Sequence, residues 1–333
     1  MIVAITGASA GIGRATAEEF AAHGWNVALM ARNAERLSSA AESVRVRGVK
    51  ALPLVVDVAD PEAVELAAEH IERELGAIDV WVNNAMATVF SPVASVTPAE
   101  FRRGTEVTYL GQVYGTMAAL KRMRVRNRGT IVNVGSALSY RAIPLQSVYC
   151  GAKYAVRGFT DALRSELLHE RSAVRIVMVH LPAVNTPQFD WALNKTARRP
   201  RPVPPIYQPE VPARAIHFAA TKLRRRELWV GQSTIKAIIA NKIVPGLLDR
   251  YLATAGYKGQ LTEEPSPGNA ANNLFETVDG DFRAHGRFDC QARDESLEMS
   301  VRRNAVPLLA GGIVALALLG LFLYRRSTPS SNR

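Results

Sequence analysis

The sequence has little cysteine: only Cys150 and Cys290 occur, far apart and in no C-x-x-C pair. Neither has a histidine at the spacing of a zinc site, so the sequence predicts no disulfide framework and no metal site. This pattern fits a reducing compartment. With 48% hydrophobic and 21% charged residues among 333, the chain can bury a full core, which excludes a wholly disordered protein.

Acidic residues are also scarce, since 30 Asp and Glu stand against 41 Lys and Arg, for a formal net charge of +11. A nucleic-acid-binding protein would combine basic clusters with aromatic side chains on which bases stack. No aromatic residue is interleaved with the basic runs, so we expect no nucleic-acid partner. The positive charge instead favours binding of an anionic cofactor or of anionic lipid headgroups. The runs are Lys121–Arg128, Arg198–Arg201 and Arg224–Arg226.

Charge is missing altogether from one long stretch, Ala305–Tyr324, which arginines flank on both sides. Its twenty residues would form a helix of about 30 Å, which matches the hydrocarbon thickness of a bilayer. A buried core helix is the alternative, but a core helix of this length usually carries some polar face and this one shows none. We expect a transmembrane helix at 305–324 and a short polar tail at 325–333.

Apolar runs rich in Val and Ile alternate with segments of helical period over about the first 230 residues. The first run lacks the basic region and cleavage site of a signal peptide, so it is expected to be a strand. The alternation predicts an α/β fold, a doubly wound parallel sheet (Rossmann fold) of about seven strands. The expected strands are Ile2–Thr6, Asn26–Met30, Ala51–Val56, Val80–Asn83, Thr130–Val134, Val174–His180 and Leu228–Val230. The expected helices are Ile12–His23, Ala34–Arg47, Pro61–Leu75, Pro98–Arg126 and Ser147–Glu170.

The pattern changes after this Rossmann-type domain, which we place at 1–235. Thr234–Tyr257 is helical and amphipathic, and residues 236–257 form the expected extension. Two roles stay open for it: it caps a substrate pocket, or it lies on a membrane surface. Residues 258–304 are polar and show neither period, so they are expected to form a flexible linker.

A glycine-rich loop, TGASAGIG at Thr6–Gly13, joins the first expected strand to the first expected helix. Its three glycines suit a tight turn, a close approach of the backbone to pyrophosphate, and close packing of helix on strand. The positive end of the helix would then face the phosphates. A glycine-rich turn that binds no ligand is the alternative, but the position between a strand and a helix favours a dinucleotide site.

Tyr149 and Lys153 lie one helical turn apart, so both project from the same face of one expected helix. A free tyrosine has a pKa near 10, and a nearby ammonium group lowers it toward the range of a useful proton donor. Ser136 ends the fifth expected strand, where its hydroxyl can hydrogen-bond a substrate carbonyl. Each feature alone is common in proteins, and the argument rests on their combination.

The glycine loop and the Ser, Tyr and Lys set together resemble the ordinary branch of the short-chain dehydrogenase/reductase family, from Ile2 to about Gly231. The resemblance implies direct hydride transfer between a nicotinamide cofactor and a carbonyl or alcohol substrate. Tyr149 would exchange the proton, Lys153 would lower its pKa and hold the nicotinamide ribose, and Ser136 would fix the carbonyl. It also implies a homodimer or homotetramer that pairs through the helices near Pro98–Arg126 and Ser147–Glu170.

The resemblance carries further residues and two departures. Asp57 matches the aspartate beside the adenine, and Asn83–Ala85 matches a motif that steadies the sheet. Thr108 replaces the asparagine that anchors a relay water behind the lysine, and the motif after the sixth strand is shortened to Pro182–Thr186. The implied cofactor contacts are Thr6, Gly7, Ser9, Gly11, Ile12, Gly13, Arg32, Asp57, Asn84, Ala85, Tyr149, Lys153, Pro182, Val184 and Thr186.

Cofactor choice depends on the end of the second strand, where NAD-preferring folds place an acidic residue on the ribose. Here Ala31 is followed by Arg32, whose guanidinium suits a 2′-phosphate, so NADP(H) is expected in preference to NAD(H). These features predict a membrane-tethered reductase or dehydrogenase with a lipophilic substrate and its catalytic domain in the cytoplasm. A nicotinamide-binding scaffold or redox sensor without turnover is the alternative.

Overall fold

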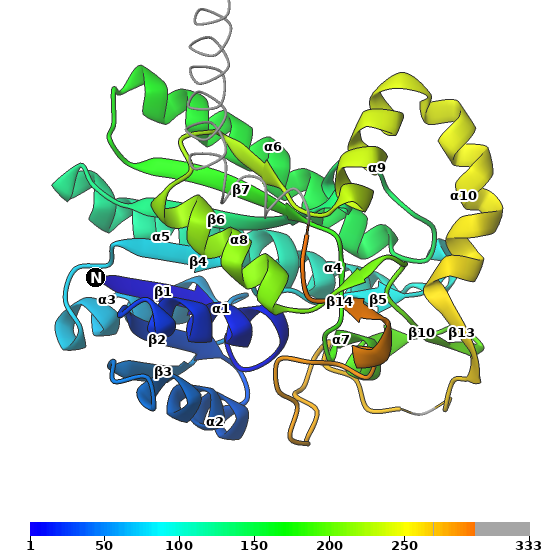
Figure 1. Cartoon of the computed structure of the whole chain (residues 1–333), viewed down its shortest axis with the longest axis horizontal. Coiled ribbons are helices and arrows are strands. Elements are labelled where there is room, and N and C mark those ends of the chain that lie inside the picture. Colours follow the sequence, from blue (N-terminus) through cyan, green and yellow to red (C-terminus); the bar gives the residue numbers. More distant parts are fainter. Residues whose placement is uncertain (269, 297–333) are drawn as a thin grey trace, which may run out of the picture.

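The computed structural model describes residues 1–268 and 270–296, and its centre is a parallel sheet of seven strands. The strand order is β12-β7-β6-β4-β1-β2-β3. Successive strands are added to one side of β1 up to β3 and then to its other side from β4 onward, so the expected doubly wound sheet is confirmed (Figure 1). The strands are β1 (Ile2–Thr6), β2 (Asn26–Ala31), β3 (Ala51–Val55), β4 (Val80–Asn83), β6 (Thr130–Ser136), β7 (Arg175–Leu181) and β12 (Glu227–Trp229).

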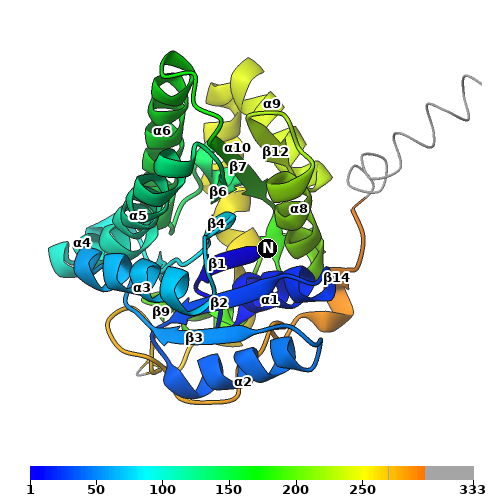
Figure 2. The same cartoon turned by 90° about the vertical axis from the view of Figure 1, so that its left-hand side faces the viewer.

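Helices cover both faces of the sheet (Figure 2). One apolar cluster joins the sheet to α1 (Gly11–Ala22), α2 (Ala34–Arg45) and α8 (Glu210–Thr221) through residues such as Phe20 and Ile216. A second cluster joins the other face to α3 (Pro61–Glu74), α5 (Gly111–Arg126) and α6 (Ser147–His169). Since both faces are covered, the strands are apolar at nearly every position, as the sequence indicated.

The expected helix over Pro98–Arg126 is not one regular helix. It consists of α4 (Pro98–Thr105), a π-helical turn at Glu106–Leu110, and α5. Thr97 caps α4, and its hydroxyl accepts from the Glu100 N–H while the Glu100 carboxylate accepts from the Thr97 N–H. Single π-turns inside helices are frequent at functional sites, and this one carries Thr108.

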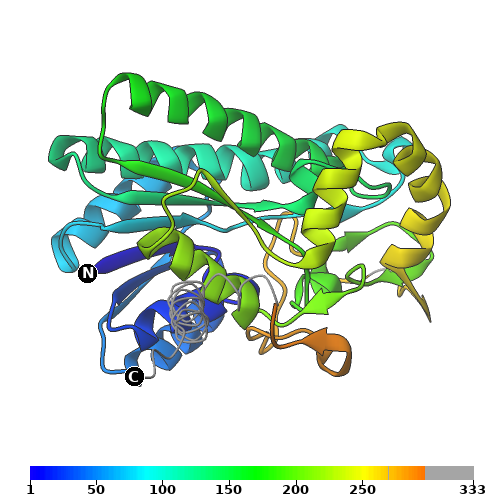
Figure 3. The same ribbon diagram turned by 45° about the horizontal axis from the view of Figure 1, so that its top comes forward.

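The amphipathic extension is also divided. It forms α9 (Gln232–Ile243) and α10 (Pro245–Gln260), with Val244 between them outside helical geometry. Pro245 explains the break, because proline disfavours helical geometry at the residue before it. The two helices lie beyond the carboxyl ends of the central strands (Figure 3).

The prediction of a flexible linker at 258–304 is wrong for the described residues of that range. β13 (Leu261–Pro265) pairs antiparallel with β10 (Arg198–Pro200), and β14 (Ala292–Arg293) pairs with β11 (Ile206–Tyr207), which pairs with β8 (Ala183–Val184). Leu274 and Phe288 are buried. Leu274, with its neighbour Phe275, and Phe288 belong to no repeating apolar pattern, so neither a helical nor a strand period reveals these anchors.

The remaining elements are short. They are β5 (Val89–Phe90), which pairs with β9 (Leu193–Asn194), the helix α7 (Gln188–Trp191), and 3₁₀ turns at Val93–Ser95, Ala137–Ser139 and Asp289–Gln291. Among the described residues, no helix is long and apolar enough to cross a bilayer. The expected transmembrane helix at 305–324 and the tail at 325–333 lie outside the described residues.

Candidate active site and cofactor cleft

The glycine loop turns between β1 and α1 in a way that only glycine allows. Gly7 and Gly11 have φ of +68° and +55°, in the region that side chains disfavour. A Cβ added to Gly13 would stand 2.0 Å from the Gly7 carbonyl oxygen, so the helix packs directly on the loop. The amides at the start of α1 therefore face the carboxyl edge of the sheet, where phosphates bind in such folds.

Three predicted residues connect this loop to the segment directly after β4. The Thr6 hydroxyl oxygen accepts hydrogen bonds from the N–H groups of Asn84 (3.0 Å) and Ala85 (3.1 Å). The Asn84 side chain donates in turn to the Thr6 carbonyl at 3.0 Å. Thr6, Asn84 and Ala85 thus hold the loop in shape.

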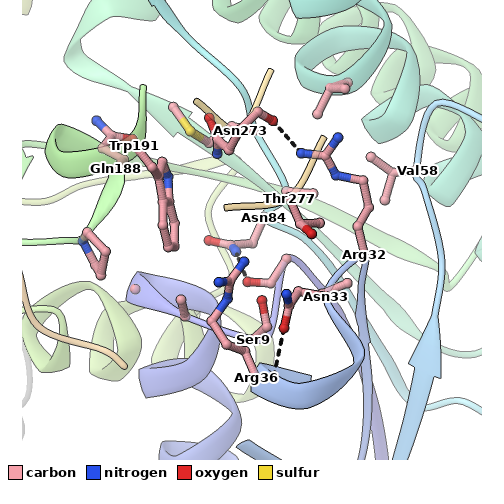
Figure 4. Close-up of a pocket in the computed structure, with 18 of the residues that line it drawn as sticks. Ser9, Arg32, Asn33, Arg36, Val58, Asn84, Gln188, Trp191, Asn273 and Thr277 are labelled. Carbon is pink, nitrogen blue, oxygen red and sulfur yellow. Dashed lines mark hydrogen bonds between the residues drawn. The ribbon is translucent and has the colours of Figure 1, made fainter. Parts of the chain in front are cut away.

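A cavity of about 160 Å³ extends from the loop to the end of β2 (Figure 4). Arg32 and Asp57 line it, and the pKa of the Asp57 carboxyl is lowered because hydrogen bonds from Arg103 and the Ala59 N–H outweigh the effect of burial. The predicted cofactor residues on its wall are Gly7, Ser9, Gly11, Ile12, Arg32, Asp57, Asn84, Ala85 and Thr186.

The residues of this cleft fit a dinucleotide phosphate. The glycine cradle leaves no room for side chains, and two guanidinium groups, those of Arg32 and Arg36, enter one cavity. Burial lowers the pKa of both guanidinium groups, so an anion bound beside them would stabilise their charged forms. The Nε of Arg36 is buried and has no hydrogen-bond partner among the described residues.

A second cavity of about 510 Å³ adjoins the first and contains the predicted catalytic side chains. Ser136 ends β6, and its hydroxyl accepts from the Leu138 N–H at 3.1 Å and hydrogen-bonds Tyr149. Lys153, which is 1% exposed, donates to the Val134 carbonyl at 2.6 Å, and its Nζ lies 5.5 Å from the centre of the Tyr149 ring. The structure therefore brings all three predicted residues together.

Burial shapes the acid–base properties of this group. It raises the pKa of the Tyr149 hydroxyl well above its usual value, although the hydrogen bond with Ser136 opposes the shift. Burial also lowers the pKa of Lys153 to about 7. Tyr149 is therefore a neutral proton donor at neutral pH, and Lys153 changes its charge near neutrality.

Thr108 is buried beside the cleft, but its hydroxyl is engaged elsewhere. It donates to the Ala87 carbonyl at 2.8 Å and accepts from the Ala87 N–H at 2.9 Å. A hydroxyl has a single hydrogen to donate, so none is left for a relay water. The geometry gives Thr108 a bracing contact between the π-turn and the segment after β4.

The segment Pro182–Thr186 forms the floor between the two cavities. Pro182, Val184 and Thr186 line the catalytic cavity, and Thr186 lines both. Asn185, which sequence reasoning missed, is fully buried and donates to Asp289 at 2.8 Å while it accepts from the Phe288 N–H at 3.0 Å. This side chain joins the floor to the C-terminal part of the chain.

Helices α9 and α10 complete the catalytic cavity. Lys236, Ala237 and Ala240 of α9 and Leu248 and Leu252 of α10 line it. The capping role expected for residues 236–257 is therefore the one that the structure places next to the catalytic side chains.

One group of potential metal ligands occurs among the described residues, Glu19, His23 and His217, whose ligand atoms lie within 4.8 Å of one another. It is at the end of α1 opposite to the glycine loop. Burial, with His23 nearby, lowers the pKa of His217 to about 4, and the two imidazole rings stack with centres 4.0 Å apart. No other feature of the described chain points to an ion there.

The cavity at the end of β2 also contains residues that sequence reasoning missed. Arg36 follows Arg32 after one helical turn of sequence, a spacing that would have indicated it. Trp191, Asn273 and Thr277 carry no such signal, because they reach the cavity from distant segments.

Comparisons with known proteins agree with this geometry. A family profile described as short chain dehydrogenase matches residues 1–196. The "Uncharacterized oxidoreductase YxnA" of Bacillus subtilis is 32% identical over 318 residues, which cover 94% of this chain and 88% of that protein. Estradiol 17-beta-dehydrogenase 11 of Mus musculus is 36% identical over 166 residues, or 50% of this chain and 56% of that protein. An alcohol dehydrogenase from the archaeon Thermococcus sibiricus, complexed with 5-hydroxy-NADP, superposes with a TM-score of 0.60 at 28% identity, covering 69% of this chain and 95% of that one. The chain therefore belongs to the short chain dehydrogenase family of NAD(P)-dependent oxidoreductases.

Proposed function

We propose that this protein is an NADP(H)-dependent reductase of lipophilic carbonyl compounds, tethered to a membrane. The observation that carries the proposal is the placement of Ser136, Tyr149 and Lys153 in one largely apolar cavity beside the glycine loop. When bound, NADP(H) supplies or accepts the hydride.

The three side chains divide the remaining work. Ser136 donates to the substrate carbonyl and fixes its orientation. Tyr149 gives its proton to the oxygen that becomes the alcohol. Burial raises the pKa of Tyr149, contrary to the lowering expected from Lys153, so the hydroxyl is protonated at neutral pH but is a weaker acid than a free tyrosine. Lys153, when charged, stabilises the phenolate that remains, since its ammonium lies one helical turn away.

The preference for NADP(H) over NAD(H) rests on Arg32 and Arg36. Each guanidinium offers five N–H donors in a planar fork that matches a phosphate. No carboxylate ends β2, where an acidic residue would bind the ribose of NAD(H) and repel a 2′-phosphate.

The lipophilic substrate and the membrane follow from the cavity and its cap. The cavity falls within the usual range for small-molecule sites, roughly 300–1,000 Å³, and side chains such as Leu181, Phe189 and Leu252 line it. Exposed apolar side chains of α9 and α10 include Ile243 (72%), Leu247 (63%) and Tyr251 (64%), and Tyr251 also lines the cavity. Exposed apolar side chains on the helices that line an apolar cavity favour entry of substrate from a lipid surface. The need for NADP(H) favours a catalytic domain on the cytoplasmic side.

A homodimer or homotetramer is supported by exposed apolar side chains on the helices through which the resemblance implies pairing. Such residues are usually covered by a partner when they gather on one surface. They are Phe101 on α4, Met117 and Val125 on α5, and Tyr154 and Leu168 on α6.

The proposal is tested by incubating the full-length chain with NADPH or NADH and a panel of aldehydes, ketones and steroids of increasing size. We expect turnover with NADPH, and kcat/KM should rise with the apolar surface of the substrate. Equal use of NADPH and NADH would contradict the cofactor assignment. A preference for small polar carbonyls would contradict the substrate class.

A further inference from the structure

The C-terminal strap, which we define as residues 270–289, passes beside α7 (Figure 1, gold to orange), and it lines the cofactor cavity through Asn273 and Thr277. Its first part is fixed by the Asn273 N–H, which donates to the Trp191 carbonyl at 2.9 Å, and by the fully buried side chain of Leu274. Its last part is fixed by Phe288 and Asp289 on Asn185. Both ends of the strap are therefore anchored to the catalytic domain.

The strap binds the two arginines of the cofactor cavity through backbone oxygens. Arg32 donates to the carbonyl of Phe275 at 2.9 Å and to that of Asn273. Arg36 donates to the carbonyls of Val278 and Gly280. Carbonyl oxygens carry no net charge, so these contacts fix the direction of each guanidinium without neutralising it.

An aromatic side chain of the strap also holds Arg36. The Arg36 guanidinium carbon lies 5.1 Å from the centre of the Trp191 ring and 5.7 Å from the centre of the Phe282 ring. The two rings pack edge to face, with centres 4.8 Å apart. Two adjacent rings, one from α7 and one from the strap, therefore restrict the guanidinium.

The strap is also a wall of the cavity itself. Asn273 and Thr277 line it opposite Ser9 and Asn33 (Figure 4). The Gly11 N–H, at the start of α1, donates to the Arg283 carbonyl at 3.0 Å. The strap thus touches the glycine loop and the end of β2, the two parts of the fold that meet the adenosine half of a dinucleotide.

We propose that the C-terminal strap is a built-in part of the cofactor site: it presets Arg32 and Arg36 to recognise the 2′-phosphate and encloses the adenosine half. The proposal rests on the NADP(H) preference proposed above. Arg36 lines the cavity, and its buried Nε has no hydrogen-bond partner among the described residues. Discrimination between NADP(H) and NAD(H) then depends on a segment that begins more than 70 residues after the part of the chain matched by the family profile.

The test uses the full-length chain and two nucleotides that occupy only this end of the site, adenosine 2′,5′-bisphosphate and 5′-AMP. Binding is measured by calorimetry for the unchanged protein and for Phe282→Ala and Leu274→Ala. Phe275→Ala is the matched control, because the Phe275 side chain is 54% exposed although its carbonyl binds Arg32. We expect the bisphosphate to bind at least tenfold more tightly than 5′-AMP to the unchanged protein.

Loss of a cation–π contact typically changes binding by about three- to thirtyfold, so Phe282→Ala should weaken bisphosphate binding within that range. Binding of 5′-AMP should change less than about twofold, and Phe275→Ala should change neither. Leu274→Ala should act in the same direction as Phe282→Ala. If Leu274→Ala does not fold, as judged by circular dichroism, Phe282→Ala alone decides the outcome.

Trypsin provides a second readout, because the side chain of Arg283 in the strap is 68% exposed. If the strap completes the site, the bisphosphate should slow cleavage after Arg283. Faster cleavage, or tighter binding by the strap variants, would show that the strap competes with the nucleotide and would overturn the proposal. A bisphosphate preference that the variants leave unchanged would overturn the strap alone, whereas no preference in the unchanged protein would overturn the NADP(H) assignment with it.

Discussion

The two halves of the cleft are built in different ways. In the catalytic half, Ser136, Tyr149 and Lys153 come from one strand end and one helix within eighteen positions of sequence. In the adenosine half, Arg32 and Arg36 meet backbone oxygens of residues 273–280, more than 230 positions away. The catalytic half is thus defined by short spacings, and the adenosine half by a crossing of distant chain segments.

This difference separates chemistry from cofactor selection. Proton transfer requires side chains at a fixed distance, and a helix supplies that distance from sequence alone. Recognition of a 2′-phosphate, as proposed above, would require charged groups held in a cavity, and the C-terminal part of the chain contacts both Arg32 and Arg36 there. Changes in the first half should therefore reduce turnover, and changes in the second half should alter the choice between nucleotides.

The largest effect is expected from Tyr149→Phe. The ring should pack as before, but the one hydroxyl that can protonate the product oxygen is lost. General acid catalysis contributes about 10²- to 10⁴-fold, so kcat should fall by that order with NADPH saturating. Nucleotide affinity, measured by fluorescence titration, should stay within about threefold. A kcat near that of the unchanged enzyme would exclude Tyr149 as the proton donor.

A smaller and more selective effect is expected from Arg32→Asp. The change places a carboxylate where the 2′-phosphate is expected to bind, so NADPH affinity should fall about 10- to 100-fold, the range for charge-assisted hydrogen bonds. NADH affinity should change by less than about threefold. Arg45→Asp is the control, since it alters net charge equally on an exposed side chain at the far end of α2. Equal losses for both cofactors would argue against Arg32 as the selecting residue.

A further effect concerns pH and Lys153. Because burial lowers the pKa of Lys153 to about 7, its charge is lost as pH rises through neutrality. The kcat for reduction should then fall about tenfold between pH 6 and pH 8, with NADPH saturating.

The free energy of unfolding should instead increase as pH rises, as far as Lys153 contributes to it. The unfolded chain binds the Lys153 proton up to a pKa near 10.4, so this group's contribution to the free energy of unfolding rises from about pH 7 to pH 10.

Lys153→Met separates these two properties. It removes the titrating group, so the remaining activity should lose this pH dependence, and the melting temperature should rise, because a buried amine is replaced by an apolar chain. The Val134 carbonyl keeps a partner in this variant, since Gln112 donates to it at 3.2 Å. A melting temperature that falls by several degrees would contradict the assigned cost of burying the amine.

The sequence predicted the sheet and the catalytic half well, because both depend on local periodicity and short spacing. The seven strands lie where Val and Ile runs indicated, and Tyr149 and Lys153 share a helix face as their spacing required. It failed for the described residues that follow residue 258. Leu274 and Phe288 are single apolar anchors, and the contacts of Arg32 and Arg36 use backbone oxygens that exist in every residue. No composition or period can reveal contacts of that kind.

The smallest effect on the enzyme is expected from ending the chain after Ser300. All described anchors of the strap lie before that point, including the pairing of β14 with β11 and the buried Ser296. The melting temperature should therefore stay within about 2 °C and kcat within about twofold, while sedimentation with membranes should decrease, because residues 305–324 are removed.

Ending the chain after Gln260 is the matched contrast. It removes the strap with Leu274 and Phe288, so it should expose apolar core surface and weaken NADPH binding strongly. If the chain that ends after Gln260 behaves like the chain that ends after Ser300, the region after residue 260 is dispensable. The difference between the two halves of the cleft then does not depend on the strap. If the chain ended at Ser300 still sediments with membranes, the tail is not the anchor, and the exposed residues of α9 and α10 become the stronger candidates for the lipid contact.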